Sequence, residues 1–150
     1  MLQLGLPQYK FSFKSKDDKT YIFDQQRKKY IRLTPEEWVR QNFIRYLVEE
    51  KQYPSALIAV EKEINVNGLK KRCDAIVYDF DAIPRIVIEF KAPHINISQA
   101  TFDQADTYNS KLQLDYFIIS NGFDHYFCKL DLQQNKYVFF DEIPPFNLLF

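Results

Sequence analysis

The sequence predicts an α+β protein with a mixed β-sheet flanked by helices. Most segments read as strands, because they are rich in aromatic and β-branched residues; the chain holds 10 Tyr and 14 Phe but only 3 Gly. Two segments with helix-start signals interrupt the strands. The order is a hairpin, a helix, three strands, a helix and further strands, with no internal repeat or linker. We therefore expect one domain over residues 1–150, a length that can bury a core.

The formal net charge is zero, because Lys+Arg and Asp+Glu are both 20. This balance excludes a uniformly basic nucleic-acid coat or an acidic disordered tail as a description of the whole chain. The charge is nevertheless uneven. Residues 1–33 hold eight basic and three acidic side chains, whereas residues 92–150 hold three basic and seven acidic ones. Ordinary surface scatter remains an alternative reading of this pattern.

The two cysteines, Cys73 and Cys128, do not form a disulfide framework. A reduced, cytoplasmic protein is therefore expected. The N-terminus lacks an apolar signal core, and no stretch of 18 apolar residues occurs. We accordingly expect neither export nor a membrane span.

The N-terminal segment, residues 1–33, is expected to form a hairpin extension. Apolar residues alternate with polar ones over residues 8–14, which is typical of a half-buried strand. A polar turn over residues 16–19 leads to a returning strand at 21–23. Residues 28–33 are a short extended lead-in to the core, which should cover residues 34–130.

A strong helix start follows. Thr34 can act as N-cap, Pro35 suits the first helical position, and Glu37 can complete a capping box. The helix is expected to run over residues 35–50 and to end near Tyr53-Pro54, because the residue before a proline avoids helix.

The remaining elements follow from turn signals and apolar runs. Asn67-Gly68 is a hairpin turn, and Ser98 is a candidate N-cap. Strands are expected at 57–66, 72–78, 85–90, 116–119 and 126–130, a helix at 98–112, and a C-terminal strand and tail within 131–150.

The candidate catalytic residues are Asp74, Glu89 and Lys91. Residues two apart in a strand share a face, so Glu89 and Lys91 point the same way. A turn centred near residues 82 and 83 would place Lys91 opposite Asp74 and Glu89 opposite Ile76. All three side chains would then share one face of the hairpin, whereas a register error of one residue would move Asp74 to the other side.

Two carboxylates and a lysine together suit phosphodiester hydrolysis. Asp and Glu oxygens can hold Mg²⁺ together with waters and a substrate phosphate. The metal acidifies a bound water, and a neighbouring lysine can position that water or offset charge. The plainer alternative is a surface salt bridge between Lys91 and an acid.

This pattern of residues resembles the PD-(D/E)XK nuclease superfamily and, more narrowly, the N-terminal nuclease domain of type I restriction enzyme R (HsdR-type) subunits. The resemblance covers roughly residues 30–130 and implies a restriction-endonuclease-like sheet. It rests on Thr34-Pro35-Glu36-Glu37 with Val39-Arg40-Gln41, Arg72-Cys73-Asp74-Ala75-Ile76-Val77-Tyr78, Ile88-Glu89-Phe90-Lys91-Ala92-Pro93, Gln104 with Tyr108, and Ser120-Asn121-Gly122. Cys73 stands where the family pattern has Pro.

The resemblance implies a role for each matching position. Asp74 and Glu89 would be the ligands of Mg²⁺, for which Mn²⁺ could substitute, and Lys91 would be the catalytic lysine. Glu36 would be the acid of the first helix, with Glu37 left to the capping box. Gln104 and Tyr108 match a helix motif whose side chains approach the site and bound DNA.

The sequence thus predicts a metal-dependent DNA endonuclease domain, and a non-catalytic DNA-binding or assembly module is the alternative. Lys70, Lys71 and Arg72 could contact phosphates near the mouth of the site, although a solvated turn would have the same composition. The expected partners are DNA and either a second copy of the chain or a larger restriction or defence complex, with no membrane. The chain contains neither a helicase motor nor a phosphate-binding glycine loop.

Overall fold

A computed structural model describes residues 1–131, 133–134 and 136–150, with the side chains of residues 108 and 110 left out. The elements run in the order β1 (Phe13–Lys16), β2 (Lys19–Asp24), β3 (Lys29–Arg32), α1 (Pro35–Glu50), a 3₁₀ turn η1 (Ser55–Leu57), β4 (Ile58–Val66), β5 (Leu69–Tyr78), β6 (Pro84–Phe90), α2 (Gln99–Leu112), β7 (Tyr116–Ser120), β8 (His125–Asp131), β9 (Lys136–Phe140) and a second 3₁₀ turn, η2 (Phe146–Leu148).

The strands form two separate sheets. The N-terminal sheet has the order β1-β2-β3, and the central sheet has the order β4-β5-β6-β7-β8-β9. Strands β6 and β7 pair in parallel, whereas the other neighbours in the central sheet are antiparallel. The α+β class and the mixed sheet flanked by helices are therefore confirmed.

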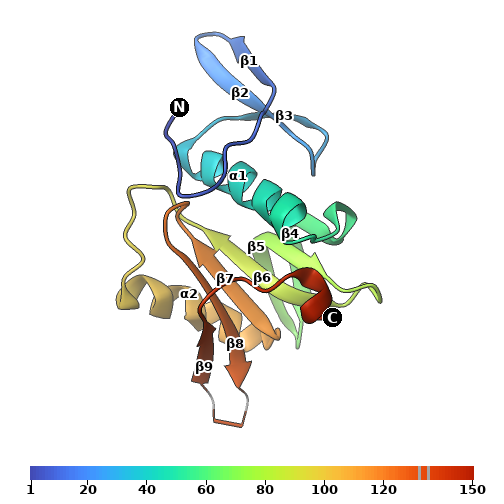
Figure 1. Ribbon diagram of the computed structural model, residues 1–150. Coiled ribbons are helices and arrows are strands. Elements are labelled where there is room, and N and C mark those ends of the chain that lie inside the picture. The colour runs from blue at the N-terminus through green and yellow to red at the C-terminus, as the bar shows by residue number, and fades with distance from the viewer. Residues whose placement is uncertain (132, 135) are drawn as a thin grey trace.

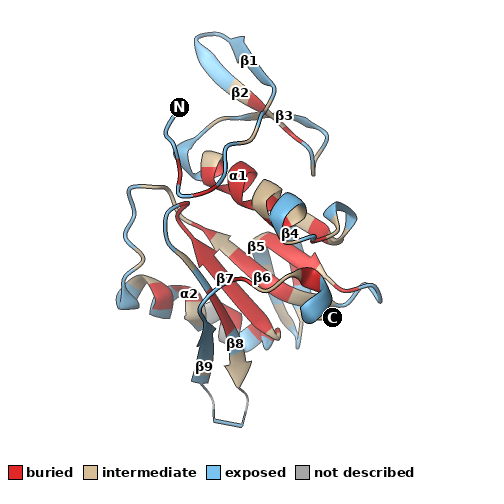
Figure 2. Cartoon of the chain, viewed as in Figure 1, coloured by how far each residue is buried: buried red, intermediate tan, exposed pale blue. Residues whose placement is uncertain are grey.

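The two helices cover opposite faces of the central sheet. On the α1 face, Phe43 packs edge-on against Phe90, with 5.7 Å between the ring centroids. On the α2 face, Phe102 packs against Phe117 at 5.5 Å. Figure 1 shows α1 lying between the central sheet and the N-terminal sheet, and Figure 2 shows that the buried residues concentrate in the central strands and in α1.

The predicted helix over residues 35–50 agrees with α1, but its capping box is only half formed. Thr34 Oγ1 accepts a hydrogen bond from the Glu37 amide at 3.0 Å. The Glu37 carboxylate does not return to the backbone. It is buried and instead accepts hydrogen bonds from Arg27 at 3.0 Å and from Gln41 at 2.9 Å. The Glu37 carboxylate thus bonds to the Arg27 guanidinium and not to the backbone amide of the N-cap residue, since a hydrogen bond from a charged donor is stronger.

The expected N-terminal hairpin is a three-stranded sheet. Its first strand begins at Phe13 and not near residue 9, because Phe11 packs on Trp38 of α1 at 5.5 Å, ahead of the pairing with β2. The polar turn predicted over residues 16–19 is a tight hairpin turn, in which Asp17 and Asp18, with φ of 52° and 61°, stand between the paired Lys16 and Lys19. The lead-in to the helix is the third strand, β3.

The predicted pairing between the two strands of the acid motif is shifted by two residues. Val87, not Glu89, lies opposite Ile76, and Ala75 lies opposite Ile88. The cause is a tight connection between β5 and β6. Asp79 Oδ1 accepts hydrogen bonds from the amides of Asp81 and Ile83, at 2.9 and 3.1 Å, and Ala82 adopts a φ of 61°.

The regular alternation of β5 breaks at Asp74. Ala75 belongs to the α1-side core, but Cys73 and Ile76 both belong to the α2-side core. In the described pairings, Asp74 is the one residue of β5 with no partner in either neighbouring strand. The facing position on β4 is Glu61, whose left-handed φ of 50° is uncommon outside glycine. Such an irregularity re-aims side chains next to functional sites.

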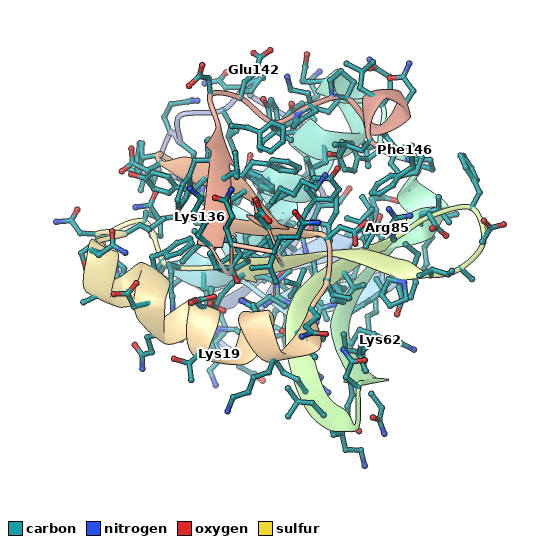
Figure 3. The ribbon with its side chains drawn as sticks, turned by 90° about the horizontal axis from the view of Figure 1, so that it is seen from below. Lys19, Lys62, Arg85, Lys136, Glu142 and Phe146 are labelled. Atoms are coloured by element: carbon teal, nitrogen blue, oxygen red, sulfur yellow. The ribbon has the colours of Figure 1, made fainter. Side chains whose placement is uncertain are left out.

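The C-terminal turn returns to the α1 side of the central sheet. Phe146 packs edge-on against Tyr53 at 5.5 Å, and Phe150 lies under the Arg85 guanidinium at 4.7 Å. Figure 3 shows Phe146 and Arg85 on the same side of the molecule. None of the helices in the described ranges is long and apolar enough to cross a membrane.

Asn121 joins the β7–β8 turn to the segment after β6. Its Oδ1 accepts hydrogen bonds from the amides of Phe123 and Asp124, at 2.9 and 2.8 Å, and its Nδ2 donates to the Ile95 carbonyl at 2.8 Å. The side chain is buried, at 3% exposure. Asn121 therefore anchors the stretch that begins at Lys91.

Asn121→Ala is expected to lower the free energy of unfolding by about 1 to 3 kcal/mol, because it removes the three hydrogen bonds of a buried amide side chain. Denaturant unfolding followed by circular dichroism measures the change. Asn96→Ala, at an exposed position of the same connection, is the control and should unfold like wild type. Equal stabilities for both variants would show that Asn121 does not anchor this segment.

Candidate functional site

The site is built where β5 separates from β6. Asp74 Oδ2 accepts a hydrogen bond from the Phe90 amide at 2.8 Å, so the carboxylate lies against the end of β6. The Lys91 amide then donates to the Ser120 carbonyl at 2.9 Å and holds the next residue on β7. The strand separation places a side chain where a backbone partner would otherwise lie.

Glu89 directly precedes these two anchored residues and is half-buried. Its Oε2 is buried and has no hydrogen-bond partner among the described residues. Both Asp74 and Glu89 raise the pKa of the neighbouring Cys73 thiol, which shows that their charges converge there. A buried carboxylate oxygen without a donor is costly, so this oxygen is suited to receive a cation.

The charge of Lys91 acts on the same group of acids. It lowers the pKa of Asp74 and of Glu36, although in both groups burial is the largest influence and leaves the pKa above its ordinary value. No ion pair involving Lys91 occurs among the described residues. The simple salt bridge considered from the sequence is therefore not formed there.

Glu36, in the first turn of α1, lies closer to this site than Glu37 does. The Asp74 charge is the second-largest influence on the Glu36 pKa, after desolvation. The Glu36 side chain is 48% exposed, so it remains open to solvent. Glu37 is instead held in the buried contacts with Arg27 and Gln41.

Arg40 and Glu61 place two further charges beside the site, and the site residues predicted from the sequence did not include them. The Arg40 side chain is only 5% exposed and donates to Glu61, which also accepts from Arg72 at 3.0 Å. Burial would raise the pKa of Glu61, but these hydrogen bonds outweigh it and hold that pKa below its ordinary value. The spacing of Glu36 and Arg40 hinted at their pairing, whereas no sequence signal marked Glu61.

The Asp74 carboxyl is an ionisable group whose charged form is disfavoured by its surroundings. Burial raises its pKa, and the Glu61 charge adds to this effect. The Phe90 amide, Arg40 and Lys91 act in the opposite direction without cancelling it. The Asp74 carboxyl therefore gives up its proton less readily than a solvent-exposed carboxyl does.

The other predicted residues lie around this centre. Gln104 is exposed on α2, and no hydrogen bond or ion pair joins it to Asp74, Glu89 or Lys91 in the described structure. The side chain of Tyr108 lies outside the described residues. In the basic run, Lys70 pairs with Glu63 at 3.5 Å, Arg72 pairs with Glu61, and Lys71 donates to Asn109 on α2 at 2.9 Å.

The described residues contain no group of three or more His, Cys, Asp or Glu side chains able to hold a metal ion. Asp74 and Glu89 supply carboxylate oxygens, which are the ligand type that Mg²⁺ prefers, and Glu89 Oε2 is buried without a hydrogen-bond partner among the described residues. Cys73 is not a candidate nucleophile, because burial raises the pKa of its thiol to about 11.

The chain is an α+β domain with a mixed six-stranded central sheet and a helix on each face of it. The chain matches the family model described as type I restriction enzyme R protein N terminus over residues 35–144, and it belongs to this family. The sequence resemblance to HsdR-type subunits is thereby confirmed.

A solved structure agrees with this membership. A fragment assigned as an HsdR subunit of a type I restriction enzyme from Vibrio vulnificus YJ016 superposes with a TM-score of 0.53 at 19% identity. The match covers 78% of this chain and 25% of that one, so the likeness concerns the fold of a small part of the larger protein. The search of curated proteins found no match.

The pKa of Asp74 leads to a stability prediction. Because the folded-state pKa is raised, the folded chain binds this proton more tightly than the unfolded chain. The contribution of Asp74 to the stability of the metal-free chain is therefore most favourable below the ordinary carboxyl pKa, and it is lost as pH rises through the raised pKa. Asp74→Asn should melt at a higher temperature than wild type at neutral pH, and the difference should shrink at pH 4.

Melting curves in chelator across this pH range test the prediction. Asp103→Asn, at an exposed position on α2, serves as the control and should follow the wild-type pH profile. A lower melting temperature for Asp74→Asn at neutral pH would mean that the carboxylate stabilises the fold.

Proposed function

We propose that the chain is a Mg²⁺-dependent DNA endonuclease domain that hydrolyses phosphodiester bonds, similar to the nuclease part of type I restriction R subunits. The observation that carries the proposal is the buried, unpartnered Glu89 Oε2 beside an Asp74 carboxylate held on the Phe90 amide. Family membership supports the nuclease-type assignment. The hydrolysis of DNA and its dependence on Mg²⁺ are both proposed.

Asp74 and Glu89 would hold the metal. Mg²⁺ is usually bound through one or two carboxylates, keeps several waters and takes substrate phosphate oxygens as further ligands. Two protein ligands are thus enough. When bound, the ion would acidify a water and stabilise the charge that develops on the phosphate.

The remaining side chains would act on substrate and water. Lys91, which has no ion pair to break among the described residues, would donate to the phosphate or orient the attacking water. Glu36, exposed in front of Asp74, would accept a proton or a water hydrogen bond. Arg40 would act as a positioning residue by fixing Glu61 and balancing its charge.

DNA would be contacted by residues at the rim. Arg72 and Lys70 are exposed on β5, and Lys71 and Gln104 lie toward α2, where a strand leaving the site could meet them. Tyr108 is retained as a candidate from the motif resemblance. The other DNA strand would be cleaved by a second copy of the chain or by a larger restriction complex. The protein would act in the cytoplasm.

A non-catalytic DNA-binding or assembly module is the second candidate. It is favoured by the absence, within the described ranges, of a three-residue metal-holding group. On this reading the domain would bind DNA with or without metal and leave it intact.

A DNA cleavage assay distinguishes the nuclease from the non-catalytic DNA-binding module. Wild-type protein should nick supercoiled plasmid in Mg²⁺ or Mn²⁺, and Asp74→Ala and Lys91→Ala should each reduce the rate at least about a hundredfold with folding preserved. Gel analysis of plasmid topology measures this rate. Lys129→Ala, on the exposed surface of β8, should cleave like wild type. Binding without any cleavage by wild type would favour the second candidate.

Metal binding can be tested without activity. Excess Mn²⁺ should stabilise wild type, by about 2.7 kcal/mol at a hundred times the Kd, and Glu89→Gln or Asp74→Asn should abolish the gain. Thermal denaturation with and without chelator measures the effect. Glu63→Gln, an exposed acid of β4, should keep the full gain. If it loses the gain as well, the metal binds nonspecifically.

A further inference from the structure

The N-terminal sheet places its cations on one face. Strand pairing sets Lys14 opposite Tyr21 and Lys16 opposite Lys19, while Tyr21 also lies opposite Arg32. Paired residues project to the same side of a sheet, as do residues two apart. All four cations therefore share a face, and all four are exposed.

Aromatic side chains lie among these cations. Phe23 and Tyr30 are paired on the same face and touch edge-on, with 5.3 Å between their centroids. Lys14 Nζ lies 4.8 Å from the centre of the Tyr30 ring. The basic–aromatic face is defined here as Lys14, Lys16, Lys19, Tyr21, Phe23, Tyr30 and Arg32.

The reverse side of this sheet is the one that packs on the protein. Ile22 and Asp24 point there and are buried, and Phe13 lies 6.3 Å from the Trp38 ring. The basic–aromatic face thus turns away from α1. Figure 1 shows the sheet standing beyond α1, and Figure 2 shows that most of it is exposed.

The seven residues of this face include no acid, and Asp17 and Asp18 lie in the turn between Lys16 and Lys19. The four cations of the face form no ion pair with described residues. Lys16 lies directly across from Lys19, and like charges in this position destabilise a strand pair. Binding of an external anion would relieve this repulsion.

We propose that the basic–aromatic face binds a nucleic-acid strand and guides it to the site, with its lysines on phosphates and its aromatic rings against unpaired bases. Cations interleaved with aromatic rings are the combination that proteins use for single strands. This inference rests on the proposed DNA-directed function. It concerns residues before position 35, outside the segment that the family model matches.

The chain joins this face to α1 over a short distance. Arg32 ends β3, and Glu36 follows four residues later and lies 3.9 Å from Arg40, which pairs with Glu61. Four residues span at most about 14 Å. A strand with a rise of about 3.4 Å per nucleotide would cover this distance in about four nucleotides. A strand that passes the Arg32 end of the face would therefore come within about four nucleotides of Glu36.

The test is equilibrium binding of a fluorescent single-stranded oligonucleotide in chelator, measured by anisotropy over a salt series. The double variant Lys16→Gln/Lys19→Gln should bind more weakly and lose about 1.4 from the slope of log K against log salt, for two phosphate contacts. Its melting temperature should equal or exceed that of wild type, because the like-charge pair is gone.

The matched control removes two charges elsewhere. Lys129 and Lys136 are exposed on β8 and β9, at the far end of the molecule in Figure 1. Lys129→Gln/Lys136→Gln should keep wild-type affinity and slope. Tyr30→Ala should lose about fivefold or more in affinity with little change in slope, since stacking carries no charge.

Two results would overturn the inference. One is wild-type affinity and slope in the Lys16→Gln/Lys19→Gln variant. The other is binding of wild type to phosphatidylserine vesicles but not to the oligonucleotide, which would assign the face to a membrane surface. Binding in chelator is independent of cleavage, so a binding-competent protein that never cuts would refute the nuclease proposal and leave this one standing.

Discussion

The hydrogen bond from the Phe90 amide to the Asp74 carboxylate is the contact on which the candidate site depends. Backbone pairing between β5 and β6 is regular only as far as Ala75 and Ile88. β6 continues beyond that point on its other side, where Phe90 pairs with Ser120 of β7. The Asp74 side chain thus replaces a missing backbone partner of Phe90 at the end of β6.

This arrangement carries energetic costs that the core offsets. Glu61 holds a left-handed backbone opposite Asp74, which costs on the order of 1–2 kcal/mol for a residue with a side chain. Asp74 is charged where burial disfavours charge, and Glu89 Oε2 lacks a donor. Fully buried side chains on both sheet faces, such as Ile76 and Ile88, supply the compensating stability. Strain and unsatisfied charge gathered at one point mark a functional site more than a structural one.

The sequence predicted features governed by local chemistry. Asn67-Gly68 forms the hairpin turn with both φ positive, and Thr34 and Ser98 cap their helices. The predicted register between β5 and β6 was wrong, because it depends on the geometry of a turn that the sequence does not specify. The register shift of two residues is even, and an even shift by itself leaves the face of each residue in a regular strand unchanged. The break in alternation at Asp74 and the contact of Arg40 with Glu61 depend on tertiary packing, so local patterns could not reveal them.

The chain has no net charge, but its basic and acidic side chains are concentrated on two different surfaces. Four cations collect on the basic–aromatic face, whereas the charges of Asp74, Glu36 and Glu61 act on one another at the split between β5 and β6. Summed over the chain the charges cancel, but each surface keeps its own local field because salt screens over about 8 Å. On the proposed function, an anionic strand would be attracted to the first surface, and a cation bound at the second surface would reduce the repulsion there. The same charge distribution would then couple the approach of the substrate to the binding of the metal, which a uniformly basic protein could not do.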